Sequence, residues 1–296
     1  MQTSDVPNAV RAAMSTASAL DLTVDDAIVL NDSNRLVLRL LPCDVVARVA
    51  PTAFQAIDEY SLWADYQARA ETEVEVVRRL GATATDSAVA VLDPRVEPRV
   101  YVRDNFVIEL WTYFEPVQSD VAPDDYAHAL ERLHAAMRQI DVTTPHFMDR
   151  VADTQRWVAT RDVTPELSDA DRGLLADTFA NLSRSIIDRS AAEQPLHGEP
   201  HQWNVLNTRH GPLFVDFENC VCGPVEFDLA WVPGEVSEHY PNTDQELLSE
   251  CRGLMLAIVA AHFWRPDSEH PNSRQGRAEF LNGVRAGPPW PAIDAL

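Results

Sequence analysis

The spacing of apolar residues in the first 111 residues alternates between helical and strand-like patterns. Apolar side chains lie roughly on one helical face over residues 6–20, which predicts a short helix. Five short apolar runs bounded by turn formers or proline predict strands, namely 27–30, 36–41, 45–49, 88–92 and 99–111. Between the third and fourth runs, residues 54–80 carry apolar positions at intervals of three or four. That spacing predicts one long helix, with Gly81 as its C-cap.

The pattern after Pro123 is mainly helical. Helices are predicted over 123–140, 146–160 and 168–190, and again from about residue 243 nearly to the end. The interval 195–232 differs, because two short apolar runs, 205–206 and 213–215, flank a Gly211–Pro212 turn and predict a β-hairpin. We therefore predict an α+β protein with a β-rich part over residues 1–111 and a larger, mainly helical part over residues 112–296.

Charge and composition exclude several classes of function. The chain has 296 residues and a net charge of −22, and all 24 basic residues are arginines. A chain this acidic is not expected to bind nucleic acid or an anionic membrane, since both require clustered cations. The absence of lysine excludes Schiff-base chemistry and a Walker A lysine. The hydrophobic fraction of 46% is that of a globular protein rather than of an acidic disordered tail.

Neither a membrane segment nor a disulfide framework is expected. The longest apolar stretch, Leu254–Ala261, is far shorter than the ~20 residues that span a bilayer. The N-terminus lacks the basic and apolar regions of a secretory signal. The four cysteines do not have the spacing of a disulfide framework, and we expect them to be reduced in a cytoplasmic protein; they are Cys43, Cys220, Cys222 and Cys251.

Residues 196–218 concentrate the side chains that could perform chemistry. Glu199 and Asn204 lie five residues apart on one segment, and Asp216 follows the predicted hairpin. Asparagine and aspartate oxygens suit Mg²⁺, which binds one or two carboxylates together with phosphate oxygens. The remaining carboxylate, Glu199, would then be free to accept a proton from an attacking hydroxyl group.

This segment resembles the catalytic loop of the aminoglycoside phosphotransferase family, a group of protein-kinase-like phosphotransferases. The family loop usually reads H-G-D-x-H-x-x-N-[IVL]-[IL], and residues 197–206 read H-G-E-P-H-Q-W-N-V-L. The following segment, 216–230, is similar to the family's D-(F/W)-E-x-(A/S)-x-x-G-(D/P)-x-x-x-D-L-A. The resemblance implies a bilobal kinase-like fold, with a small antiparallel sheet lobe and a larger helical lobe. It also implies phosphoryl transfer from ATP or GTP, with Mg²⁺, to a hydroxyl group.

The resemblance assigns roles to residues of the catalytic segment. Glu199 would be the catalytic base, and Asn204 and Asp216 would bind the metal ion. His197 corresponds to the histidine that braces the loop. Asp228 corresponds to the aspartate that hydrogen-bonds the loop backbone.

The resemblance also assigns residues to nucleotide binding. Arg48, the only basic residue of its strand, would hold phosphate oxygens in place of the usual lysine. The helix register points to Glu73 as the partner of that base, with Glu71 and Glu75 as competitors. The turn 31–34 stands where a glycine-rich loop is expected, and the Ser33 hydroxyl could face phosphate.

Further nucleotide contacts are expected around the adenine. Residues 109–112, including Glu109 and Trp111, would form the hinge whose backbone meets the adenine edge. Leu206 and Val215, on the predicted hairpin, are further expected contacts of the nucleotide.

Two features leave alternatives open. Glu199 replaces the family's usual aspartate, and a shift of about 1.5 Å in the carboxylate can cost ~10²-fold in rate. A catalytically silent nucleotide- or ligand-binding protein is therefore the alternative to an enzyme.

The acceptor is the second open point. Residues 226–269 hold nine acids against two arginines, which suits a cationic acceptor such as an aminoglycoside or basic peptide antibiotic, or simply a solvated acidic surface. Aromatic residues such as Trp231 and Tyr240 could instead line a pocket for a sugar, choline-like or macrolide alcohol. The choice of ATP or GTP and the oligomeric state stay open.

Overall fold

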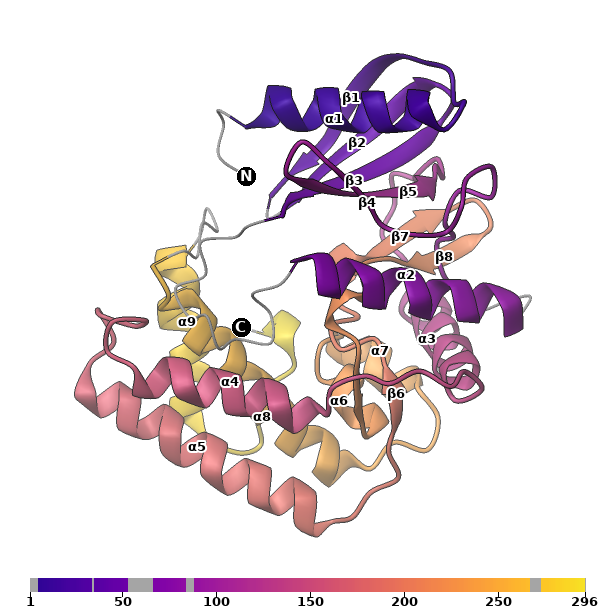
Figure 1. The fold of residues 1–296 in the computed structure, drawn as a ribbon. Helices are drawn as coiled ribbons and strands as arrows, with labels where there is room; N and C mark the ends of the chain where they lie inside the picture. The colour runs from indigo at the N-terminus through magenta and orange to yellow at the C-terminus, as the bar shows by residue number, and fades with distance from the viewer. Residues whose placement is uncertain (1–4, 34, 53–65, 84–87, 267–272, 296) are drawn as a thin grey trace.

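The computed structural model describes residues 5–33, 35–52, 66–83, 88–266 and 273–295. A sheet-rich N-terminal part packs against a larger helical part (Figure 1). The N-terminal part contains α1 (Val6–Ala19), β1 (Val24–Asp32), β2 (Leu36–Pro42), β3 (Val45–Pro51), α2 (Tyr66–Thr83), β4 (Tyr101–Arg103) and β5 (Phe106–Thr112). Its strands form an antiparallel sheet in the order β1-β2-β3-β5-β4. The predicted α+β fold, with an antiparallel sheet before a mainly helical part, is confirmed.

Alternation along the strands gives this sheet one apolar face and one charged face. Leu36, Leu38 and Leu40 of β2 are fully buried and pack, with the buried residues of β3, against α1. Side chains of the intervening positions point to the opposite face, because successive strand residues alternate. Arg48 of β3 lies on that face and is paired in register with Glu109 of β5. The alternation of the strands therefore places the Arg48 and Glu109 side chains on the face of the sheet away from α1.

The second part is built mainly of helices. Its elements are α3 (Pro123–Met137), α4 (Phe147–Ala159), α5 (Asp169–Asp188), β6 (Gln194–Leu196), η1 (Gln202–Asn204), β7 (Val205–Thr208), β8 (Gly211–Phe214), η2 (Phe217–Asn219), β9 (Val221–Gly223), α6 (Val225–Leu229), α7 (Gly234–His239), α8 (Gln245–Phe263), α9 (Ser273–Ala286) and η3 (Ile293–Ala295). β6 pairs with β9, and β7 pairs with β8. Among the described helices, none combines the length and apolar character needed to cross a bilayer.

Local capping explains several helix starts in this part. Asp244 accepts hydrogen bonds from two backbone N–H groups at the start of α8, and Ser168 accepts one at α5. His146 and Asp149 form a reciprocal capping box at α4. The predicted helices at 123–140, 146–160 and 168–190 are confirmed to within three residues at each end.

Several predicted elements were wrong in detail. The predicted strand 99–111 is two strands, because Asp104 and Asn105 adopt left-handed backbone angles and form a tight turn. Residues 88–92 form isolated bridges to Phe214 and Trp111, since their backbone bonds are divided between two sheets. The turn of the β7–β8 hairpin lies at residues 209–210 and not at the predicted Gly211–Pro212, because residues 211–212 already belong to β8.

The long helix of the N-terminal part also differs from its prediction. Helix α2 continues past Gly81 to Thr83, so Gly81 is not its C-cap. Residues 54–65 of the predicted helix lie outside the described residues. Val76, Val77 and Leu80 join the hydrophobic core of the helical part. Helix α2 therefore contacts both parts of the molecule, and a division at residues 111 and 112 stays a prediction.

Candidate active site

One buried aspartate fixes the backbone of residues 197 and 198, which directly follow β6. Asp228, at the C-terminal end of α6, accepts hydrogen bonds from His197 N at 2.9 Å and from Gly198 N at 2.8 Å. His134 of α3 contacts the same carboxylate at 3.0 Å through Nε2. Gly198 has a φ of +90°, and a Cβ there would lie 1.9 Å from the carbonyl oxygen of Asn219. Only glycine fits this left-handed position, so the sharp turn before Glu199 is encoded locally.

His197 links the loop to the hairpin that follows it. Its Nε2 lies 3.0 Å from the carbonyl oxygen of Val215, and its Nδ1 lies 3.4 Å from the backbone N of Glu199. Burial lowers the pKa of the imidazole. The neutral ring can therefore donate from Nε2 to the carbonyl and accept at Nδ1. These contacts fit the bracing role expected from the sequence.

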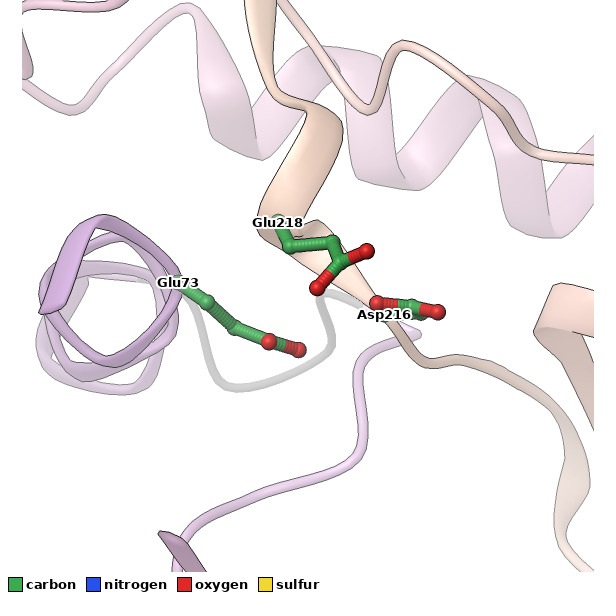
Figure 2. A group of neighbouring side chains, drawn as sticks. All are labelled: Glu73, Asp216 and Glu218. Carbon is green, nitrogen blue, oxygen red and sulfur yellow. The ribbon is translucent and has the colours of Figure 1, made fainter. Parts of the chain in front are cut away.

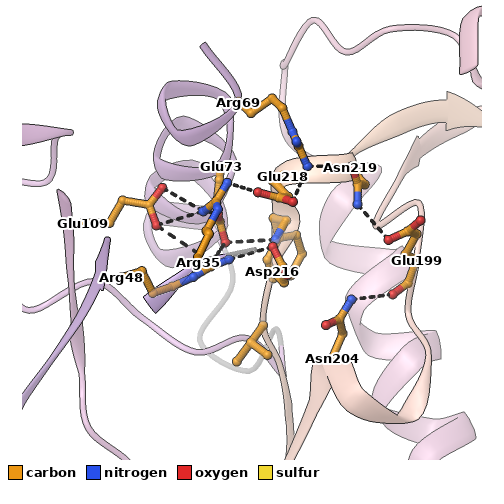
Figure 3. A network of polar contacts seen from close by, with 12 residues as sticks. Arg35, Arg48, Arg69, Glu73, Glu109, Glu199, Asn204, Asp216, Glu218 and Asn219 are labelled. Carbon is orange, nitrogen blue, oxygen red and sulfur yellow. Dashed lines mark hydrogen bonds and ion pairs between the residues drawn. The ribbon is translucent and has the colours of Figure 1, made fainter. Parts of the chain in front are cut away.

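The loop and hairpin bring Glu199, Asn204 and Asp216 into one region (Figure 3). The Asn204 amide nitrogen donates to the backbone oxygen of Glu199 at 3.0 Å, and Val215 N donates to Asn204 O at 3.0 Å. Asp216 follows with φ 71° and ψ 62°, the left-handed region that aspartate tolerates better than most residues. The Asp216 side chain lies against β3 of the sheet, where Arg48 contacts it.

Arg48 connects the sheet to this region. Its guanidinium contacts Glu73 Oε1 through Nη1 and Asp216 Oδ1 through Nη2, the latter at 2.7 Å. Glu73 Oε1 also accepts from Phe217 N at 3.0 Å. Burial alone would lower the pKa of Arg48, but the three nearby carboxylates raise it by more. The net pKa is raised, so Arg48 stays charged. Burial alone would raise the pKa of Asp216, but Arg48 and Arg35 hold it well below its usual range.

The structure selects Glu73 among the candidate glutamates of α2. Glu73 is fully buried and contacts Arg48, whereas Glu75 pairs with Arg78 and Arg79 at the surface. Glu71 accepts a hydrogen bond from Gln67 and is exposed. The helix register therefore places one glutamate, Glu73, against the strand base.

The Glu109 side chain lies among buried charged groups on the side of the sheet away from α1, and the hinge role expected for the backbone of residues 109–112 stays a prediction. Its carboxylate is 1% exposed and lies 3.4 Å from Arg35 Nη1 and 3.8 Å from Arg48 Nη1. Trp111 donates to it from Nε1 at 3.3 Å. The backbone of this segment is partly used within the protein, since Leu110 O accepts from Asp93 N and Thr112 N donates to Val91 O. Burial and the neighbouring Glu73 raise the pKa of Glu109 to about 7.

Two arginines that the sequence did not single out complete this cluster. Arg35, directly before β2, contacts Glu73 Oε2 at 3.2 Å and also pairs with Glu218. Arg69 of α2 pairs with Glu218 and donates to Asn219 Oδ1 at 3.3 Å. Burial, followed by repulsion from Arg35, lowers the pKa of Arg69 to about 10. Three guanidinium groups thus face four carboxylates, those of Glu73, Glu109, Asp216 and Glu218.

Both carboxylate oxygens of Glu199 are held by the protein. Arg150 of α4 pairs with Oε1, and the Asn219 side-chain amide donates to Oε2 at 2.7 Å. Burial alone would raise the pKa of Glu199, but attraction to Arg150 and then His201 outweighs it, and the pKa lies below its ordinary value. Glu199 is therefore ionised, as a hydrogen-bond acceptor for a hydroxyl group requires.

The side chains that could hold a divalent cation here would bind it through oxygen atoms. Carboxylate oxygens of Glu73, Asp216 and Glu218 lie within 4.8 Å of one another (Figure 2). Glu73 and Glu218 each pair with two arginines, whereas Asp216 pairs with Arg48 alone, so Asp216 is the better candidate. Asn204 uses its amide N–H toward Glu199, which leaves its Oδ1 available for a cation. The donor set fits Mg²⁺, which prefers oxygen ligands.

A model of the phosphotransferase enzyme family (APH) matches residues 26–251. The chain belongs to the phosphotransferase enzyme family. Among curated proteins, the protein LicA homolog of Mycoplasma capricolum subsp. capricolum is 33% identical over 58 residues. That match spans 20% of this chain and only 24% of the relative.

Solved structures agree with this family assignment at the level of the fold. The complex of amicoumacin kinase hAmiN with AMP-PNP, Ca²⁺ and Ami has a TM-score of 0.70 at 11% identity, covering 98% of both chains. The GDP and kanamycin complex of APH(2″)-IIIa has a TM-score of 0.64 at 13% identity, covering 92% of this chain and 96% of that chain. The family is that of phosphotransferase enzymes, and the chain shares its fold with these two small-molecule kinases.

Within this phosphotransferase family member, the structure adds site residues that sequence reasoning missed. Glu218 and Asn219 directly follow the Asp216–Phe217 pair, so their position in the motif was a usable signal. Arg35 directly follows the turn that stands in place of a glycine-rich loop. Arg150 offered no signal, since it lies on a helix 49 residues before Glu199.

The remaining predicted nucleotide contacts lie close to this cluster in the fold. Ser33 is exposed on the turn between β1 and β2 and accepts a hydrogen bond from Asn31. Leu206 pairs with Leu213 across the β7–β8 hairpin, and both Leu206 and Val215 are half-buried. Their roles in nucleotide binding stay predictions.

Proposed function

We propose that the protein is an ATP- or GTP-dependent O-phosphotransferase that acts on a hydroxyl group of a small molecule. One observation carries this proposal. The Arg48–Glu73 pair on the sheet side is bonded directly to Asp216, beside the loop that holds Glu199 and Asn204. A phosphate-binding base, a carboxylate and amide for a metal ion, and a catalytic carboxylate are thereby collected in one region (Figure 3).

In this proposal Arg48 binds the phosphates of the nucleotide, and Glu73 orients the Arg48 guanidinium. A fixed guanidinium can bind two phosphate oxygens at once. Ser33 contacts phosphate from the β1–β2 turn, while Glu109 and Trp111 border the nucleotide from β5. Leu206 and Val215 contact it from the hairpin.

The metal ion in this proposal is Mg²⁺, held by Asn204 and Asp216. When bound, it would neutralise phosphate charge. The low pKa of Asp216 keeps that carboxylate ionised and able to serve as a ligand. Arg48 would then share Asp216 with the metal ion, since the guanidinium occupies only Oδ1.

Glu199 would orient and deprotonate the acceptor hydroxyl group. The hydroxyl oxygen forms a bond to the γ-phosphorus, the bond from that phosphorus to the bridging oxygen breaks, and the nucleoside diphosphate leaves. The hydroxyl proton passes to Glu199. Because its pKa is low, Glu199 contributes mainly by orienting the hydroxyl group before the proton moves late in the reaction.

A cationic, aminoglycoside-like antibiotic is the proposed acceptor, which would make this a resistance enzyme. The kanamycin complex among the structural neighbours supports this choice. The acidic residues of 226–269 give this acceptor weaker support, because several of them are already bonded to other groups of the protein. Asp228 braces the loop, Asp244 caps α8, and Glu246 and Glu250 pair with Arg189. A cytoplasmic location, where nucleoside triphosphates are available, belongs to the same proposal.

A nucleotide-consumption assay tests this function. ATP and GTP would each be offered with Mg²⁺ and a panel of aminoglycosides, other amino alcohols, sugars and macrolides. We expect acceptor-dependent turnover that requires Mg²⁺ and falls by 10²-fold or more in Glu199→Gln, while nucleotide still raises the melting temperature. Turnover by Glu199→Gln equal to that of the native protein would contradict the assignment of the base.

The silent-protein alternative has one observation in its favour. Both oxygens of Glu199 and one oxygen of Asp216 are already bonded to protein groups. Thermal stabilisation by Mg-nucleotide without turnover on the whole panel would favour that alternative. Thermal stabilisation by neither nucleotide would contradict the enzyme and the nucleotide-binding form of the alternative, and would leave only the binding of another ligand.

A further inference from the structure

We propose that Arg150 and Asn219 form a clamp that positions the Glu199 carboxylate for the reaction. This inference rests on the proposed phosphotransferase function and assigns two positioning residues to it. The clamp answers a specific problem of this chain. A glutamate has one more side-chain torsion than the aspartate usual in this family, so its carboxylate has more positions available. Contacts from two sides restrict it to one.

Arg150 holds the loop at two points. It is 9% exposed and projects from α4, an element outside the catalytic motif. Its Nη2 pairs with Glu199 Oε1, and its Nη1 donates to Gly198 O at 3.3 Å. The guanidinium carbon also lies 4.8 Å from the centre of the Trp231 ring, which limits its movement. One rigid group therefore fixes the backbone before Glu199 and the end of its side chain.

Asn219 holds the other oxygen from the opposite side. Its Nδ2 donates to Glu199 Oε2 at 2.7 Å, while its Oδ1 accepts from Arg69 Nη2 at 3.3 Å. The Asn219 backbone is itself fixed, because its carbonyl lies directly against Gly198. Glu199 is thereby connected through Asn219 and Arg69 to helix α2, which also carries the Arg48 partner Glu73 (Figure 3).

The clamp leaves the carboxylate able to act. A carboxylate offers about four acceptor directions, and the two contacts use one on each oxygen. One lone pair per oxygen remains for an acceptor hydroxyl group. A positioning role predicts that loss of the clamp lowers kcat and leaves nucleotide binding intact, because neither Arg150 nor Asn219 contacts Arg48 or Asp216 among the described contacts.

Steady-state kinetics of substituted full-length protein would test the clamp. Arg150→Met keeps side-chain length and removes the charge, and Arg150→Lys keeps the charge and loses the fork. We expect kcat to fall on the order of 10²-fold in Arg150→Met and less in Arg150→Lys, with little change in nucleotide KM. Asn219→Ala should lower kcat in the same way. Added guanidinium ion should restore part of the activity of Arg150→Ala, which a purely structural loss would not allow.

Arg161→Met is the matched control. Arg161 follows the end of α4 and pairs with Asp169, and both side chains are largely exposed. Its kcat should equal that of the native protein. Unchanged kcat in Arg150→Met, or a fall with no guanidinium rescue and a matching loss of nucleotide binding, would overturn the clamp.

Crystal structures separate failure of the clamp from failure of the proposed function. If the native protein turns over no acceptor, the function fails, yet the position of Glu199 can still be compared between native and Arg150→Met crystals. The clamp requires the carboxylate to move by about 1 Å or more, or to become disordered, when the guanidinium is removed. An unmoved carboxylate overturns it whatever the activity.

Discussion

Arg48 donates a 2.7 Å hydrogen bond to Asp216 Oδ1 across 168 positions of the sequence. The bond joins the sheet-rich part to the hairpin that follows the catalytic loop. Lysine has one nitrogen, whereas the arginine fork can serve Glu73 and Asp216 at once. In a chain without lysine, the arginine that we propose for phosphate binding thus also connects two parts of the candidate site.

Replacement of Arg48 should impair nucleotide use more than folding of the rest of the chain. We expect Arg48→Met to lower kcat/KM for nucleotide by roughly 10²–10³-fold, because charge neutralisation at the phosphates is lost. Arg48→Lys should lose roughly tenfold, since one ammonium cannot hold both carboxylates. Nucleotide titrations of kcat and KM would measure both. Full activity in Arg48→Lys would show that the fork has no role.

Restoring the aspartate usual in this family should lower activity. Glu199→Asp withdraws the carboxylate by about 1.5 Å from Arg150 and Asn219, and we expect kcat to fall roughly 10–10²-fold. The measurement is kcat at saturating nucleotide, with circular dichroism as a check on folding. A rise in kcat would mean that this loop is not adapted to glutamate.

Gly198 should tolerate no side chain. Gly198→Ala puts a Cβ 1.9 Å from Asn219 O at a φ of +90°, and we expect a loss of roughly 2–4 kcal/mol in unfolding free energy. Gly211 is the control, since it also has a positive φ but no heavy atom within 4 Å of an added Cβ. Gly211→Ala should cost only about 1 kcal/mol. Urea unfolding of the two variants would compare them, and equal losses would refute the close contact.

Glu109 should make stability depend on pH. Its pKa is raised from 4.5 to about 7 on folding, so the folded protein binds this proton more tightly than the unfolded chain. The stabilisation is complete below pH 4.5 and is lost as pH rises through 7. Glu109→Gln removes it.

The test of Glu109 compares how the unfolding free energy changes with pH in the native protein and in Glu109→Gln. Urea unfolding of native protein and Glu109→Gln would be measured across pH 4.5 to 7. The native protein should lose on the order of 2–3 kcal/mol more than the variant over that range. Parallel curves would show that Glu109 titrates normally.

Local sequence signals were sufficient where chemistry depends on neighbours in the chain. The motif over residues 197–206 predicted the loop through its resemblance to the family, and two apolar runs around a turn predicted the hairpin that follows. By contrast, residues 88–92 have strand-like composition, yet their backbone bonds are divided between two sheets.

The sequence by itself determined the α+β pattern, the absence of lysine chemistry and the family motif over residues 197–230, because these depend on composition, periodicity and short-range spacing. Tertiary structure decided which charges meet. Arg150 reaches Glu199, and Arg35 reaches Glu109. These pairs are brought together by the packing of α2, α4 and the sheet around the catalytic loop, and side-chain contacts across such distances leave no periodic trace in the chain.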